Sequence, residues 1–158
     1  ADRMNEKHTI AVLGIGNPLC RDDGIGILII QEMRNSGRYK TVDLIDGGTA
    51  PDLFSLLDEN VEKLIIVDAL KGGKKPGSIY RLDITDESIA QEPPVSLHGL
   101  GVLDSLKMMK QLDLHRPQVT IIGIEPVDTS HGLKLSPLLE ALVPDIIATL
   151  EEEIRLCH

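Results

Sequence analysis

One stretch limits what this chain can fold into more than any other, residues 13–26, LGIGNPLCRDDGIG. An apolar run ends at Leu13 and leads into two glycines, the acid pair Asp22–Asp23 follows, and an apolar helical pattern begins at once. A buried strand, a glycine turn and a helix in this order are typical of an open α/β sheet, in which ligands bind at the carboxyl ends of the strands. The stretch therefore predicts a pair of carboxylates at the ligand-binding edge of a parallel sheet.

The rest of the chain continues this alternation of strands and helices. Apolar runs predict buried strands at residues 9–16, 41–45, 63–67 and 119–124, and an alternating pattern predicts an antiparallel edge strand at 78–84. Helical patterns begin at residue 22 or 23, at Pro51, after an N-cap at Ser96, and after an N-cap at Ser136. We therefore expect an α/β fold: a single three-layer domain with a mostly parallel, twisted sheet of about five strands and helices on both faces.

Length and composition agree with one globular domain. The 158 residues favour a single domain at residues 9–158, preceded by a flexible N-terminus at residues 1–8, part of which is an expression remnant if translation starts at Met4. Aromatic residues make up only 2% of the chain, so the core must be aliphatic and an aromatic platform for single-stranded nucleic acid is excluded. The net charge of −9 argues against binding to a phosphate backbone and favours a basic or neutral partner surface.

The cysteines and the apolar runs of the sequence indicate the cellular compartment in which the protein works. Cys20 and Cys157 are far apart in sequence and form no CxxC motif, which disfavours a disulfide scaffold and a thiolate zinc site. No apolar run reaches membrane-spanning length, and the polar start of the chain does not resemble a signal peptide. We expect a reduced, cytoplasmic protein without membrane insertion.

Acidic residues follow four of the predicted strands: Asp23, Asp46, Asp68 and Glu125. The carboxyl ends of parallel strands share one edge of a sheet, so these acids are candidates for a common site. A single acid after a strand is weak evidence, because Asp is frequent in turns and at helix N-caps. Asp23 and Asp68 are the stronger pair, because neighbouring strands would bring them close together.

A carboxylate cluster needs a positive partner to stay ionised, and a bound metal ion would supply it. His98, in the sequence SLHGLG, falls in the predicted first turn of a helix, where the helix dipole favours the neutral imidazole that coordinates metals. Two carboxylates and one imidazole suit nickel, zinc, cobalt or iron. A lone histidine in this position is more often structural. His131 is expected to be structural or to contact substrate, and His8, His115 and His158 to be solvated.

The sequence lacks the motifs that several other kinds of binding or catalytic site require. The turn at Gly14–Gly16 has Leu19 where a dinucleotide-binding fingerprint needs its third glycine, and acids would face the pyrophosphate. The chain contains neither a phosphate-binding GxxxxGK loop nor a GxSxG elbow, and Cys20 has no histidine nearby in sequence. We therefore expect no nucleophilic triad.

A set of short motifs occurs in a recognisable order and spacing: GIGNPLCRDDGIG, DGGTA at 46–50, IIVDA at 65–69, PGSIYRL at 76–82, SLHGLG at 96–101 and GIEP at 123–126. Together they resemble the hydrogenase maturation endopeptidases, over residues 9 to about 150. That family removes a C-terminal peptide from the large-subunit precursor of nickel–iron hydrogenases once the metal centre is loaded. The resemblance implies a monomeric α/β endopeptidase whose partner is this precursor.

The resemblance also implies a metal site on Asp23, Asp68 and His98, the trio already favoured by strand ends and charge. Family members have Glu or Asp at the first position, and Asp23 is one methylene shorter than Glu. The nickel would be carried by the precursor, with zinc or cadmium able to occupy the site in vitro. The turn of Asp46, Gly47, Gly48 and Thr49 matches a family loop that is expected to place the substrate tail.

Two alternatives stay open at this point. One is a non-catalytic metal-binding chaperone for the precursor, which would use the same acids and His98. The other is a nucleotide-binding module built on the glycine turn. The role of Asp22 is also open between capping the following helix, holding the turn and binding a ligand.

Overall fold

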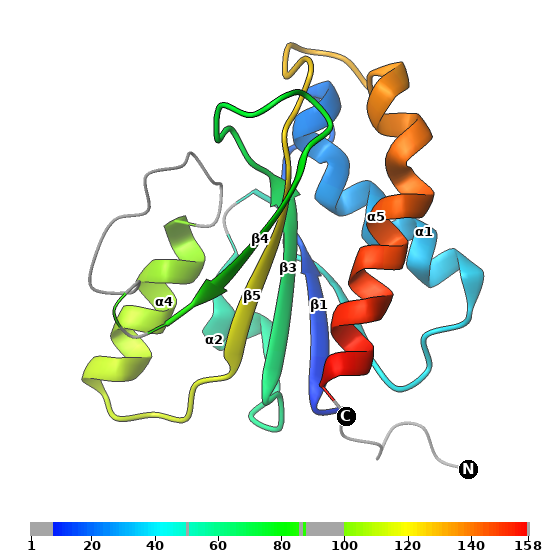
Figure 1. The fold of residues 1–158 in the computed structure, drawn as a ribbon. Coiled ribbons are helices and arrows are strands. Elements are labelled where there is room, and N and C mark those ends of the chain that lie inside the picture. The colour runs from blue at the N-terminus through cyan, green and yellow to red at the C-terminus, as the bar shows by residue number, and fades with distance from the viewer. Residues whose placement is uncertain (1–7, 50, 86, 88–99, 158) are drawn as a thin grey trace.

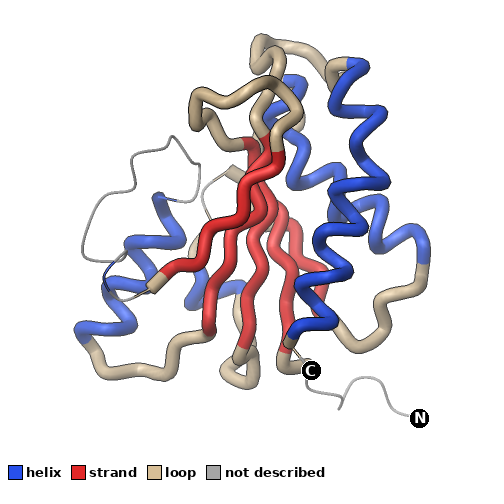
Figure 2. Tube along the Cα trace, in the orientation of Figure 1, coloured by secondary structure: helices blue, strands red, loops and turns tan. Residues whose placement is uncertain are grey.

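The computed structural model describes residues 8–49, 51–85, 87 and 100–157 (Figure 1). Strands and helices alternate along the chain (Figure 2), in the order β1 (Ile10–Gly14), η2 (Arg21–Gly24), α1 (Ile25–Ser36), β2 (Asp43–Asp46), α2 (Leu53–Leu56), β3 (Lys63–Ala69), β4 (Ile79–Ile84), α4 (Leu100–Gln111), β5 (Gln118–Ile124) and α5 (Pro137–Leu156).

The strands form one five-stranded sheet in the order β2-β1-β3-β5-β4. Strands β1, β2, β3 and β5 are parallel, and β4 pairs antiparallel with β5 at the edge of the sheet. In the observed register Gly14 pairs with Asp46 on one side and Val67 on the other, so β1 and β2 end at the same level and β3 continues two residues further, to Ala69. The expected α/β class, the strand number and the antiparallel edge strand are confirmed.

Helices cover both faces of the sheet and create two aliphatic layers. Helices α1 and α5 pack on one face (Figure 1), where their side chains meet Ile65 and Val67 of β3. Helices α2 and α4 pack on the other face, against Leu64 and Ile66 of β3. Side chains alternate between the two faces of a strand, so Asp68 belongs to the face covered by α2 and α4.

The first helix begins later than the sequence predicts. The acid pair lies in a short 3-10 helix, Arg21–Gly24, and regular α-helix starts only at Ile25. The helix ends where expected, because Gly37 adopts the left-handed conformation (φ +67°) that closes many helix C-termini. The acids therefore precede α1 and do not form its first turn.

The starts of α2 and α5 can also be compared with the prediction, and the start of α5 is confirmed. Helix α2 is a single turn that begins after Pro51, and its N-cap is Asp52, whose side chain accepts a hydrogen bond from the Phe54 amide. Ser136 occupies the N-cap position of α5, with Pro137 at the first helical position, but its side chain makes no capping hydrogen bond. Two further predictions, the N-cap at Ser96 and the flexible residues 1–7, lie outside the described residues. No helix in the described part of the chain has the length and apolar character needed to cross a bilayer.

Candidate active site

The turn after β1 is fixed by contacts that only glycine permits. Gly16 has φ +146°, and a Cβ atom there would lie 2.0 Å from the Asp23 carbonyl oxygen. The neighbouring Ile15 amide donates to the carbonyl of Val67 (3.0 Å), and the Gly16 amide donates to that of Gly48 (2.9 Å). The glycine turn therefore lies against the backbone of the acid pair, the end of β3 and the turn after β2.

Asp23 and Asp68 both lie at the carboxyl edge of the sheet. Asp23 is only 8% exposed, and its Oδ2 accepts a hydrogen bond from the Asn17 amide (3.1 Å). Asp68, the second-last residue of β3, is fully buried. The 3-10 helix that contains Asp23 packs against β3. Neighbouring parallel strands thus bring two buried carboxylates to the edge at which ligands bind in this class of fold.

Asp22 is a structural residue. It is fully buried, and its carboxylate accepts hydrogen bonds from the amides of Val127, Asp128 and Ser136 and from the Ser136 hydroxyl, at 2.7–2.9 Å. These donors come from the segment between β5 and α5. Asp22 therefore fastens that segment to the 3-10 helix, which explains why the Ser136 hydroxyl does not cap α5.

The turn predicted to hold substrate lies beside the glycine turn. Asp46 Oδ1 accepts a hydrogen bond from the Gly48 amide (3.0 Å), and the Gly47 amide donates to the Gly14 carbonyl (2.8 Å). Asp46 and Thr49 are exposed, and Gly47 and Gly48 are partly buried. The turn is thus an open rim next to the edge where Asp23 lies, and its role in substrate binding stays a prediction.

Glu125 belongs to no acid cluster that could hold a metal ion among the residues that the structure describes. Its side chain is 6% exposed, and Oε1 accepts hydrogen bonds from the Gly72 amide (3.0 Å) and the Tyr80 hydroxyl (2.8 Å). Burial, together with this hydrogen bond, raises the pKa of Tyr80. The structure thus assigns Glu125 to organising the loop between β3 and β4.

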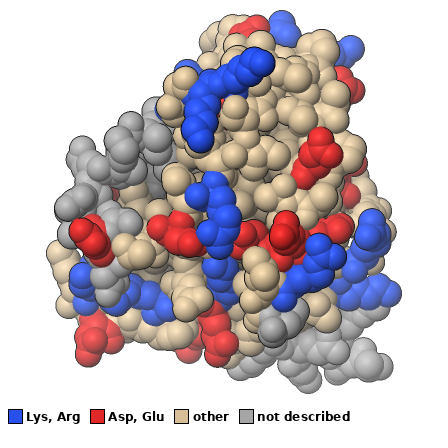
Figure 3. Space-filling model, viewed as in Figure 1, with Lys and Arg blue, Asp and Glu red and all other residues tan. Residues whose placement is uncertain are grey.

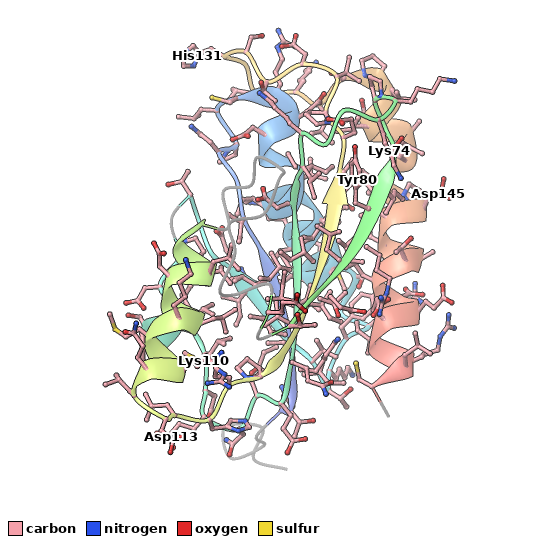
Figure 4. All side chains as sticks on the ribbon, turned by 60° about the vertical axis from the view of Figure 1, so that its left-hand side comes forward. Lys74, Tyr80, Lys110, Asp113, His131 and Asp145 are labelled. Carbon is pink, nitrogen blue, oxygen red and sulfur yellow. The ribbon has the colours of Figure 1, made fainter. Side chains whose placement is uncertain are left out.

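The structure places a histidine beside Cys20, although none is near it in sequence. Cys20 Sγ lies 4.0 Å from His131 Nδ1, because Cys20 and Gly132 form an isolated parallel bridge. Figure 4 shows His131 at the end of the molecule opposite Lys110 and Asp113. Among the described residues no carboxylate lies within hydrogen-bond distance of His131, so a nucleophilic triad is not completed there.

The third predicted ligand, His98, lies outside the described residues. Helix α4 begins at Leu100 and packs on the same face of the sheet as Asp68. Within the described ranges, no group of three or more His, Cys, Asp or Glu side chains is arranged to hold a metal ion. His8, predicted to be solvated, is instead partly buried, and its Nδ1 lies 2.7 Å from Asp43 Oδ1.

Comparison with known proteins decides the family. The model of the hydrogenase maturation protease family matches residues 27–153. The chain belongs to this family. It is 31% identical over 153 residues to the hydrogenase 2 maturation protease of Escherichia coli K12, covering 90% of this chain and 91% of that protein.

Solved structures of hydrogenase maturation proteases have the same fold. The hydrogenase maturating endopeptidase HybD from Escherichia coli superposes with a TM-score of 0.77 at 29% identity, covering 94% of this chain and 93% of that one. A nickel–iron hydrogenase maturation protease from Thermococcus kodakarensis gives 0.76 at 25% identity, covering 90% and 97%. The chain is therefore an endopeptidase of the hydrogenase maturation type, which favours the enzyme over the chaperone and the nucleotide-binding module.

Proposed function

We propose that this hydrogenase maturation protease removes the C-terminal extension of the large-subunit precursor of a nickel–iron hydrogenase after nickel has been inserted. Asp23, Asp68 and His98 recognise the nickel that the precursor brings. The observation that supports this proposal best is the pair of buried carboxylates, Asp23 and Asp68, at the ligand-binding edge of the sheet. A metal ion on the substrate would add a positive charge beside these carboxylates, and a positive charge favours their ionised, metal-binding form.

The proposed ligands determine when the protease can cleave its substrate. Carboxylate and imidazole ligands suit nickel, and the same ligands accept zinc or cadmium in vitro. Because the metal arrives with the substrate, the protease is idle until a loaded precursor binds. Hydrolysis then follows by polarisation of the scissile carbonyl or by activation of water, with Asp23 as the candidate base.

The surrounding elements have supporting roles in this proposal. The turn of Asp46, Gly47, Gly48 and Thr49 guides the substrate tail along the rim beside Asp23. We also propose that the protease works as a monomer in the cytoplasm, in keeping with its two free thiols, Cys20 and Cys157.

Substitution of the proposed ligands tests the assignment. Asp68→Asn and His98→Ala should each abolish shortening of the nickel-loaded precursor, read as its intact mass, because each removes one proposed contact to the metal. Circular dichroism should show that both variants stay folded. Asp113→Asn is a matched control, because it makes the same change at an exposed position just after α4 and keeps the three ligands, so it should retain cleavage. Normal cleavage by both ligand variants would refute the site, and a bound precursor of unchanged mass would indicate a chaperone.

A further inference from the structure

The loop between β3 and β4 contains three lysines, Lys71, Lys74 and Lys75, in the sequence KGGKKPG. All three are exposed, and no described carboxylate lies within salt-bridge distance of their ammonium groups. Figure 3 shows basic side chains over this loop, surrounded mainly by uncharged ones. We call Lys71, Lys74 and Lys75 the lysine loop. It is a local basic surface on a chain of net charge −9.

The lysine loop has a defined shape. Buried Glu125 accepts hydrogen bonds from the Gly72 amide and the Tyr80 hydroxyl, and the Tyr80 hydroxyl in turn accepts one from the Lys74 amide (3.0 Å). The ammonium of Lys74 lies over the Tyr80 ring, 5.4 Å from its centroid, and Figure 4 shows the two residues side by side. The backbone at Gly72 and Lys74 and the Lys74 ammonium are therefore held in place before a partner binds, which lowers the entropy cost of binding.

A cleft of about 400 Å³ separates the lysine loop from the segment after β5. Lys71 and Lys74 line one wall, and Pro126, Val127 and Thr129 line the other. Asp22 fixes the second wall through the Val127 amide, and Asp23 is the next residue along the chain. Lys71 lies only three residues beyond Asp68. The cleft is thus connected on both sides to the segments that hold the candidate acids.

We propose that the lysine loop is a docking site for an acidic segment of the precursor protein, with carboxylates held by Lys71, Lys74 and Lys75 beside the cleft. This inference rests on the proposed function, because it takes the precursor as the partner. Elsewhere the net negative charge of the protease repels an acidic segment. The lysine loop therefore fixes where and in which orientation such a segment approaches.

Charge reversal with a matched control tests the docking site. Lys74→Glu/Lys75→Glu changes the charge by −4 at the loop, and Lys40→Glu/Lys110→Glu makes the same change at exposed positions elsewhere. We expect the loop variant to raise the Kd and KM for the precursor by about tenfold or more while kcat stays within about twofold. The control variant should leave all three constants within about twofold. A hexaglutamate peptide should compete with the precursor, and added salt should weaken binding by wild type more than by the loop variant.

The outcomes separate this inference from the proposed function. Unchanged Kd and KM in the loop variant would overturn the docking site even if cleavage by wild type is normal. The docking site is also overturned if wild type does not bind the precursor, or if the loop variant loses binding only to phosphatidylserine vesicles. If wild type binds the precursor without shortening it, the proposed function fails, and the Kd of the loop variant still decides the docking site.

Discussion

Asp22 and Asp23 are adjacent in the chain, but their surroundings give them different roles. Asp22 is fully buried and surrounded by four hydrogen-bond donors from the segment after β5. Asp23 accepts a hydrogen bond from the Asn17 amide and lies on the 3-10 helix that packs against β3. The first acid therefore holds the structure together, and the second is the candidate for contact with the substrate.

Removal of the Asp22 carboxylate should destabilise the protein strongly. Asp22→Ala leaves buried amide donors of the 127–136 segment without an acceptor, and we expect a loss of about 3–5 kcal/mol in the free energy of unfolding. Urea-induced unfolding measures this loss, and the isosteric Asp22→Asn variant should fall between Asp22→Ala and wild type. The exposed Asp46 accepts only one local hydrogen bond from Gly48, so Asp46→Ala should cost about 1 kcal/mol or less. Equal losses at Asp22 and Asp46 would contradict the structural role of Asp22.

The sequence predicts this part of the site incompletely, for a physical reason. The position of Asp23 and Asp68 after apolar strands is a local pattern, and it predicts that both lie at the edge of the sheet. The partners of Asp22 are more than 100 residues away, as is the histidine beside Cys20. Such contacts depend on how the loops pack, which hydrophobic periodicity does not encode.

Among the elements, α1 and α5 pack side by side on one face of the sheet, and a tyrosine just after α1 connects them. Tyr39 donates a hydrogen bond from its hydroxyl to the Glu151 carboxylate of α5. Burial, followed by this hydrogen bond, raises the pKa of Tyr39 from 10.0 to about 12. The contact therefore depends on the phenol keeping its proton.

This contact predicts a loss of stability at high pH. The folded protein binds the Tyr39 proton more tightly than the unfolded chain, so the contribution is complete below pH 10 and is lost as the pH rises toward 12. The chain has only two tyrosines, so Tyr80→Phe leaves Tyr39 as the sole phenol. Its tyrosinate absorbance should rise near pH 12 in the folded variant and near pH 10 in denaturant. A folded midpoint near 10 would show that Tyr39 is not held by Glu151.

The sequence predicts the strands better than the helix starts. The strands have long aliphatic runs, whereas the helix starts depend on tertiary contacts. The aliphatic runs that form β1, β3 and β5 are long and unambiguous. The start of α1 depends on Arg21, which adopts φ +48°, and on the glycine contacts that press the 3-10 helix against the turn. Helix α2 is shortened to one turn. Such details follow from tertiary packing that overrides local helical preference.

At the scale of the whole molecule, the parallel sheet collects the ends of separate segments at one edge. Asp23 follows β1, the turn that begins at Asp46 follows β2, Asp68 is the second-last residue of β3, and the lysine loop comes next. Their common position follows from the strand order and register. The sequence pattern predicts a mostly parallel sheet but neither its strand order nor its register. The same edge thus brings together Asp23 and Asp68, the substrate rim and the docking site.

The central claim is that cleavage waits for nickel on the precursor. The most direct test incubates wild-type protease with nickel-loaded and nickel-free forms of the same precursor and follows the intact mass of each with time. We predict that the loaded form loses its C-terminal extension and that the nickel-free form keeps it under identical conditions. Cleavage of the nickel-free precursor at the same rate would contradict the account.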